Sequence, residues 1–329
     1  MQRWDVKILA MAMAGLGFSA GAAAAAPTVA VSIAPLAGIA AAVMADAGKP
    51  TLLLPPGQSP HHAALKPSQA RALTRTDVVL WIGPDMEMGL DKALDARPED
   101  WVKAHVMTAM SLPGVTLRQF RHLEEIGPDE REPAHEDAHE KPHAGETHAA
   151  EEHHHHHGSA NPHLWLDPAN GAAIAQALAE RLAALDAAHA ALYRANAARF
   201  AASLETLKGD LAARLSGLGG KGFVVFHDAY AYFEEPFGLT AVAALTLDPG
   251  QPIGGKHLSE VRDKVRATGA VCVFADEQAS KQAVAGMARD LGLRVGTLDP
   301  IGAHVAPGPD AYPALLRNLA EAYRACLGK

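Results

Sequence analysis

Cysteine is scarce in this chain, because Cys272 and Cys326 are the only two among its 329 residues. No CxxC-type spacing is present, so the usual framework of a thiolate metal site is missing. In an oxidising compartment two cysteines most simply form one disulfide, which would stabilise the fold by roughly 4 kcal/mol in the chain-entropy model. Metal ligation by the two thiolates is the alternative.

Apolar runs long enough to cross a membrane are also lacking. Beyond the first 26 residues no stretch reaches about 18 uninterrupted apolar residues. The chain begins with Arg3 and Lys7, followed by an apolar stretch over 8–18 and small residues over 20–26 that offer Ala-x-Ala cleavage sites. This order is typical of an export signal. We interpret residues 1–26 as a cleaved signal peptide, and we expect no membrane-spanning segment in the mature protein.

An excess of positive charge is absent, since the formal net charge is -8, and this argues against nucleic acid as a partner. The charge is uneven: residues 122–157 hold eleven Asp and Glu, two Lys and Arg, and ten of the eighteen histidines. With almost no large apolar side chain, this segment cannot offset its ordering entropy. We predict that 124–160 is a disordered loop that binds metal weakly at several places. A merely solvated loop, or a purification tag for 153–157, are the alternatives.

Alternating strand and helix patterns cover most of the remaining chain. The first part predicts strands at 28–33, 51–54 and 77–82, and helices at 36–47, 67–75 and 86–93. The last part predicts strands at 222–226, 239–245, 271–275 and 294–298, and helices at 256–268, 280–291 and 310–326. This rhythm is typical of parallel sheets covered by helices on both faces.

A long helical region lies between these two parts. Asp167 fits the N-cap position and Pro168 the first helical position. Ala- and Leu-rich periodicity then continues to residue 215, with a break expected near Asp186. We therefore predict an α/β protein whose two lobes, 27–166 and 221–329, have mostly parallel sheets and are joined by a long rigid helix within 167–220. A helical hairpin in a single core is the alternative.

Polar residues follow the predicted strands where parallel sheets collect their ligands, at the carboxyl ends. They are His61 on a proline-stiffened turn, His227 and Asp228, Asp276 and Glu277, and Asp299. A further histidine, His163, stands in the apolar segment NPHLWLDP, and imidazole is the commonest metal ligand in proteins. The alternatives are an exposed loop residue for His61, a core residue for His163 and a turn residue for Asp299.

Four motifs in this order and spacing resemble the zinc-specific solute-binding proteins (ZnuA-like) that feed ABC importers. They are SPHHAALKPSQ at 59–69, NPHLWLDP at 161–168, VVFHDAYAYFEEPFGL at 224–239 and TLDPIG at 297–302. The resemblance covers essentially the whole mature chain, including the acidic His-rich segment. It implies two α/β lobes joined by a long rigid helix, with one metal ion in the cleft between them.

Carried over residue by residue, the resemblance implies that His61, His163 and His227 are the metal ligands. Asp299 or a water takes the fourth place. Some relatives have an acidic residue before the first histidine, whereas this chain has Pro60. Cys272 and Cys326 match the disulfide of the carboxyl lobe in some members. The implied protein is a periplasmic monomer that captures zinc and delivers it to an ABC permease in the inner membrane.

The chemistry of the ligands also favours zinc. Three neutral imidazoles suit tetrahedral zinc, whereas manganese prefers oxygen-rich sites, and manganese-type relatives carry a carboxylate where this chain has His227. The alternatives are transport of manganese or another divalent metal, and a zinc buffer or adhesin without an importer. A zinc hydrolase is a further one, with Asp228 or Glu234 as base. HExxH spacings occur only at 135–139 and 139–143, within the segment predicted to be disordered, whereas a catalytic HExxH motif needs a helix, so we expect no enzymatic activity.

Overall fold

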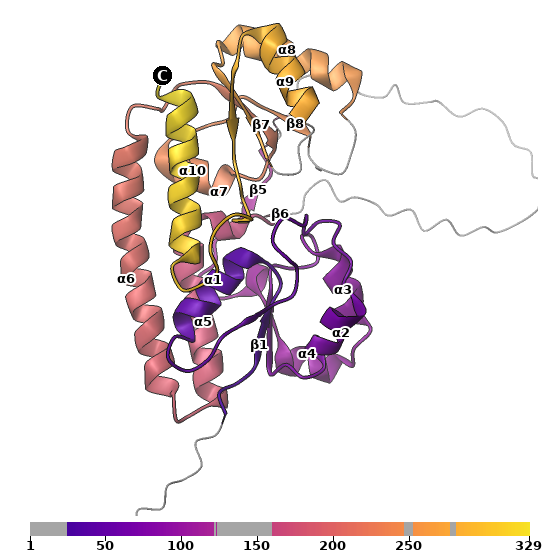
Figure 1. Ribbon diagram of the computed structural model, residues 1–329, viewed down its shortest axis with the longest axis vertical. Helices are drawn as coiled ribbons and strands as arrows, with labels where there is room; N and C mark the ends of the chain where they lie inside the picture. The colour runs from indigo at the N-terminus through magenta and orange to yellow at the C-terminus, as the bar shows by residue number, and fades with distance from the viewer. Residues whose placement is uncertain (1–24, 122, 124–159, 247–252, 277–280) are drawn as a thin grey trace, which may run out of the picture.

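The computed structural model describes residues 25–121, 123, 160–246, 253–276 and 281–329. Within these residues the chain forms two lobes, each built on a four-stranded parallel sheet with flanking helices (Figure 1). The predicted α/β class and two-lobed architecture are confirmed. The signal peptide predicted at 1–26 and the loop predicted at 124–160 lie almost wholly outside the described residues.

The first lobe is a sheet with β1 at a central place. Its strands are β1 (Val29–Val31), β2 (Thr51–Leu52), β3 (Val78–Trp81) and β4 (Val106–Thr108), in the order β2-β1-β3-β4. Every residue of β1 and β3 is buried, as expected of strands covered on both faces. The helices are α1 (Ala34–Val43), α2 (Pro67–Leu73), α3 (Met88–Asp95) and α4 (Glu99–His105).

The second lobe repeats this strand order. Its strands are β7 (Phe223–His227), β8 (Ala243–Thr246), β9 (Cys272–Ala275) and β10 (Arg294–Thr297), in the order β10-β9-β7-β8. The helices are α7 (Ala231–Glu234), α8 (Gly255–Thr268), α9 (Lys281–Leu291) and α10 (Ala311–Leu327). In both lobes the strand order reverses beside the first strand, which is where such sheets bind ligands at their carboxyl edge.

Two consecutive helices connect the lobes. They are α5 (Pro168–Leu185) and α6 (Ala190–Leu215). The Asp167 carboxylate caps the start of α5 by accepting a hydrogen bond from the backbone N–H of Ala169. The break expected near Asp186 is confirmed. With 26 residues α6 is about 39 Å long, and Figure 1 shows it running along both lobes beside α10.

One apolar core continues through both lobes and these connecting helices. It includes Val31 of the first sheet, Phe223 of the second, Tyr193 of α6 and Tyr312 of α10. The Trp165 indole N–H donates to the carbonyl oxygen of Pro300 at 2.7 Å, and the Tyr312 hydroxyl donates to the carbonyl oxygen of Trp165 at 2.6 Å. Because separating the lobes would expose this shared core to water, the fold resists wide hinge motion.

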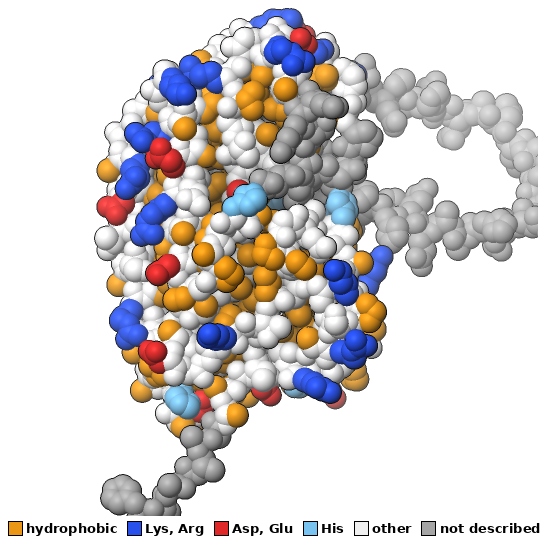
Figure 2. Space-filling view, in the orientation of Figure 1, with side chains coloured by type: hydrophobic (Ala, Val, Ile, Leu, Met, Phe, Trp, Pro, Cys, Tyr) orange, Lys and Arg blue, Asp and Glu red, His pale blue; other side chains and the backbone are white. Residues whose placement is uncertain are grey.

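Apolar side chains also gather on the surface along the junction of the lobes. Figure 2 shows them across the middle of one face, with charged side chains mainly around them. A cavity of about 540 Å³ lies there between α1 and the segment after β10, and Pro35, Leu52, Ile301 and Val305 contribute to its walls. Lys49 is the charged residue among those that line it.

A short antiparallel pair of strands was not predicted. It consists of β5 (Arg118–Gln119) and β6 (Ala160–Asn161). Two-residue strands are too short to show periodicity, and these pair across about forty residues of chain, so a sequence pattern cannot indicate them. Helix α4 and strand β4 were likewise not predicted from the sequence. After α7 the chain makes one 3-10 turn, Glu235–Phe237, which ends where Gly238 adopts a left-handed conformation with φ of +67°.

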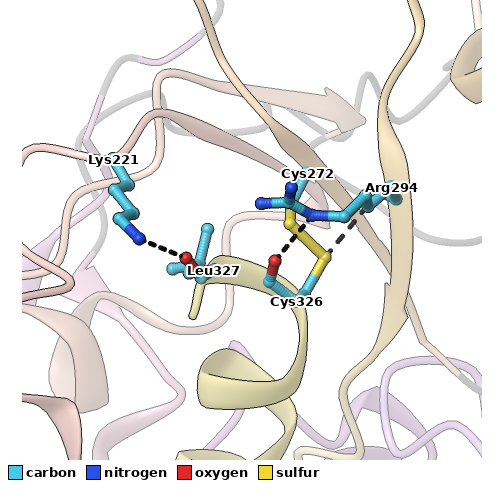
Figure 3. The surroundings of a disulfide bond; sticks show 5 residues. All are labelled: Lys221, Cys272, Arg294, Cys326 and Leu327. Atoms are coloured by element: carbon cyan, nitrogen blue, oxygen red, sulfur yellow. Dashed lines mark hydrogen bonds between the residues drawn. A yellow bond between two sulfur atoms is a disulfide. The ribbon is translucent and has the colours of Figure 1, made fainter. Parts of the chain in front are cut away.

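The predicted disulfide joins Cys272 on β9 to Cys326 near the end of α10 (Figure 3). Two hydrogen bonds also hold the end of α10. The guanidinium of Arg294 donates to the carbonyl oxygen of Cys326 at 2.8 Å, and the ammonium of Lys221 donates to the carbonyl oxygen of Leu327 at 2.7 Å. The disulfide prediction is confirmed, and no free thiolate remains to bind a metal.

Removing this disulfide should lower the free energy of unfolding by about 4 kcal/mol, because it closes a loop with a sequence separation of 54 residues. The change is the double substitution Cys272→Ala and Cys326→Ala, measured by urea unfolding of the mature protein. The control is wild-type protein unfolded in the presence of a reductant, which breaks the disulfide without removing the two cysteine side chains. Equal unfolding free energies with and without the bond would contradict this expectation.

Candidate metal centre

Three histidines from distant parts of the chain meet at the junction of the two lobes. One ring nitrogen of each of His61, His163 and His227 lies within 4.8 Å of the others. The ring centroids are 5.3 Å apart for His61 and His163, 6.2 Å for His61 and His227, and 5.2 Å for His163 and His227. In the part of the chain that the structure describes, no other group of three or more His, Cys, Asp or Glu side chains is gathered in this way.

His227 is the last residue of β7 and is almost fully buried. Its Nδ1 lies 2.6 Å from Oδ2 of Asp276, which directly follows the neighbouring strand β9. Because a carboxylate accepts hydrogen bonds, Nδ1 carries the proton, and Nε2 is left with its lone pair. Asp276 thus fixes the tautomer and the ring orientation of His227.

His163 follows β6 and opens a short 3-10 helix, Leu164–Leu166, whose side chains are all buried. The side-chain oxygen of Asn161 lies 3.0 Å from the backbone nitrogen of His163 and 2.8 Å from its Nδ1. The amide nitrogen of Asn161 donates to the carbonyl oxygen of Asp228 at 2.8 Å, which fixes which way the amide points. His163 therefore also carries its proton on Nδ1 and presents a lone pair on Nε2.

The two Nε2 atoms of His163 and His227 are 3.4 Å apart. With both protons on Nδ1, two lone pairs face each other, an arrangement that a cation relieves. A tetrahedral zinc ion with Zn–N distances of about 2.0–2.1 Å keeps its nitrogen ligands about 3.4 Å apart, so this pair is already at the right spacing. His61 would need to approach by on the order of 1 Å.

Burial lowers the pKa of His163 well below its ordinary value of 6.5, and the neighbouring His227 and His61 lower it further. The cause is that a buried imidazolium loses its hydration and meets like charges. His163 is consequently neutral at neutral pH, which is the form that binds a metal.

His61 comes from the loop after β2, in a turn that begins with Pro55 and Pro56 and includes Gly57 at a φ of +82°. Its side chain is partly exposed, whereas those of His163 and His227 are buried. The three ligand candidates thus come from one loop of the first lobe, from the segment that precedes α5, and from the sheet edge of the second lobe. An ion held by all three would bridge the two lobes.

Asp299 is not a member of the histidine cluster. Its Oδ1 accepts hydrogen bonds from the backbone N–H groups of Ile301 at 3.2 Å and Gly302 at 2.8 Å. These bonds are those of a turn residue, the alternative raised by the sequence. Metal ligation by Asp299 stays a prediction.

Asp228 and Glu234 bind Arg121. The guanidinium forms ion pairs with both carboxylates, and the hydroxyl of Tyr323 donates to Glu234. The two carboxylates that could have served as a catalytic base are thus both paired with one largely buried guanidinium. Of the other sequence candidates, Glu277 lies outside the described residues.

Two residues of the site were missed by the sequence reasoning. Asn161 belongs to the NPHLWLDP motif, but nothing in the motif shows that its amide holds a histidine. Arg121 follows β5 and ties the β5-β6 pair to the second lobe through Asp228 and Glu234. Asp276 was expected at the sheet edge as a ligand-binding group, and the structure gives it a different contact, with the imidazole of His227.

Comparison with known proteins gives one consistent result. The family model described as the periplasmic component A of the zinc-uptake complex matches residues 29–326. The "High-affinity zinc uptake system protein ZnuA" of Brucella suis biovar 1 is 39% identical over 315 residues, covering 92% of each chain. The protein of the same name from Yersinia pestis is 36% identical over 300 residues, covering 91% of each.

Solved structures share the fold. A crystal structure of ZnuA has a TM-score of 0.72 at 24% identity and covers 92% of this chain and 99% of its own. The solute-binding protein FpvC from Pseudomonas aeruginosa, in complex with Ni2+, has a TM-score of 0.71 at 18% identity, with coverage of 92% and 97%. No helix among the described residues is both long and apolar enough to span a bilayer.

The metal-free protein should lose stability through His163 on acidification below about pH 6.5, because the unfolded chain then binds the proton that the buried imidazole resists. Glu87 has the opposite effect on the free energy of unfolding. Burial raises its pKa to about 7, so the folded state binds this proton more strongly than the unfolded chain does, and acidification from pH 7 stabilises the fold through this residue. The variant His163→Gln separates the two effects, because it keeps Glu87 and loses only the imidazole.

The free energy of unfolding is measured in EDTA for wild type and variant. The wild-type value minus the variant value should decrease from pH 7.5 to pH 5.5. A difference that does not change with pH would contradict the assignment.

Proposed function

The chain belongs to the family of periplasmic zinc-uptake component A proteins, whose model matches 29–326, and we propose that it captures one zinc ion at His61, His163 and His227 and delivers it to an ABC permease in the inner membrane. The observation that carries this proposal is the convergence of three imidazole nitrogens within 4.8 Å, two of them on rings oriented by hydrogen bonds. Zinc is the cargo here, and the protein does not retain it for chemistry.

The donor set supports zinc over the harder cations. All three members of the cluster are imidazoles, and nitrogen ligands of this kind suit zinc, whereas magnesium, calcium and manganese prefer oxygen. Copper and nickel also bind imidazole strongly, so selection against them depends on tetrahedral geometry and on metal supply. The near-tetrahedral spacing of His163 and His227 supports selection by geometry.

The remaining parts of the chain fit the same role. We propose that 1–26 direct export and are removed, that the mature protein acts as a monomer in the periplasm, and that 124–160 collect zinc and pass it inward. We propose the domain boundaries predicted from the sequence, with lobes at 27–166 and 221–329 and a connecting region at 167–220. We propose no catalytic role, because Asp228 and Glu234 are both paired with Arg121.

Replacing the three histidines by alanine should abolish the tight zinc site. Calorimetric titration would use mature protein with 124–160 deleted, so that weak sites do not contribute. We expect one zinc per chain before the substitution and an affinity at least about 100-fold lower after it, since each imidazole supplies a coordinate bond. The matched control is His62→Ala, whose ring lies 6.4 Å from that of His61 outside the cluster. Tight zinc in the triple variant would refute the site.

Asp276→Asn should weaken zinc binding by roughly 10- to 100-fold, because groups that orient a metal-bound histidine typically contribute that much. The variant loses the charge that holds the Nδ1 proton of His227. Zinc affinity is measured by competition with a chelator, and thermal unfolding of the metal-free form tests that the fold is intact. Asp310→Asn, at an exposed carboxylate before α10, is the control. Equal affinities of Asp276→Asn and wild type would contradict an orienting role.

A further inference from the structure

Tyr230 has a buried hydroxyl group that has no hydrogen-bond partner within the described structure. The residue stands three positions after His227, directly before α7, and its side chain is 1% exposed. A buried phenol normally finds a partner, because leaving its hydroxyl unpaired costs free energy. An unpaired hydroxyl of this kind points to a group that is bound there in function.

The position of Tyr230 is defined by its neighbours. Its ring centroid lies 6.0 Å from that of His227, with the rings edge to face. The charges of Asp276 and Asp299 both act on the phenol and, after burial, raise the pKa of Tyr230 well above its ordinary value. Asp276 contacts His227, and Asp299 precedes Pro300, which accepts a hydrogen bond from the indole of Trp165. The phenol thus lies beside the ring of His227 and within reach of the charges of Asp276, Asp299 and Glu234.

Three histidines leave a tetrahedral zinc ion one ligand short. Two nearby carboxylates already hold other groups with one oxygen each: Oδ2 of Asp276 accepts from Nδ1 of His227, and Oδ1 of Asp299 accepts from two backbone N–H groups. Pro60, next to His61, has no donor atom in its side chain. A water molecule is therefore the candidate for the fourth ligand, and a buried water needs further polar partners besides the metal.

We propose that the hydroxyl oxygen of Tyr230 accepts a hydrogen bond from a water molecule that is the fourth ligand of the bound zinc. This assignment rests on the proposed zinc site of His61, His163 and His227. Tyr230 is then a positioning residue that acts through the water. The consequence is one exchangeable ligand position: small anions can replace the water, and a ligand of the receiving protein can enter there when the ion is released.

Cobalt(II) tests this assignment, because its visible absorption reports the ligands of a tetrahedral site. Full-length mature protein receives one equivalent of Co2+, and the spectrum of the triple histidine variant is subtracted to remove binding elsewhere. Sodium azide is then titrated. We expect azide to shift the wild-type bands, and Tyr230→Phe to keep one ion per chain while changing the azide midpoint and lowering zinc affinity about tenfold.

Tyr193→Phe is the matched control. Its hydroxyl is buried on α6 and donates to Asp186, away from the cluster, so the cobalt spectrum and azide midpoint should match those of wild type. Identical azide titrations for wild type and Tyr230→Phe would overturn the proposal. A second result would also overturn it: azide leaves the wild-type cobalt spectrum unchanged, and Asp299→Asn changes that spectrum. The carboxylate of Asp299 would then be the fourth ligand. Failure of the zinc site itself would appear differently, as a cobalt spectrum that survives in the triple histidine variant.

Discussion

Two imidazole nitrogens held 3.4 Å apart with their lone pairs facing each other are the arrangement on which the site depends. Left alone, two histidines would turn away or share a proton. Here Asn161 holds one ring and Asp276 the other, each through its Nδ1 atom. Because burial also disfavours the protonated form of His163, a metal cation is the best way to satisfy both lone pairs. The fold thus keeps the pair ready for a metal before the metal arrives.

This arrangement requires a rigid surrounding, and the core supplies it. The largest apolar cluster runs through both sheets and the helices α1, α5, α6 and α10, so the lobes share one core, and each lobe has a smaller cluster of its own in addition. Tyr312 binds the backbone just after His163, and Gly38 and Gly171 leave no room for a side chain where α1 and α5 approach it. His61, partly exposed on its loop, is the proposed ligand best placed to move. For an ion held at the proposed site, entry and exit would require movement of this loop more than separation of the lobes.

Much of this molecule could be predicted from the sequence, because its main elements are long and regular. The buried valine-rich strands, the break in the connecting helices near Asp186 and the disulfide all follow from local pattern or from cysteine count. The three histidines were found through their motifs. The roles of Asn161 and Asp276 were not, since a side-chain hydrogen bond depends on tertiary geometry. The pairing of Arg121 with Asp228 joins residues 107 positions apart, and no local pattern carries such information.

The repeated strand order allows the carboxyl edges of the two sheets to be compared position by position. In both lobes the pairing of the first strand with the third joins residues 49 positions apart, as Val29 with Val78 and Phe223 with Cys272. Counted from these pairs, Ile33 and Ile82 occupy the places of His227 and Asp276. The two lobes differ at this edge: the second bears the polar pair His227 and Asp276, whereas the first is apolar there and contributes His61 from a loop.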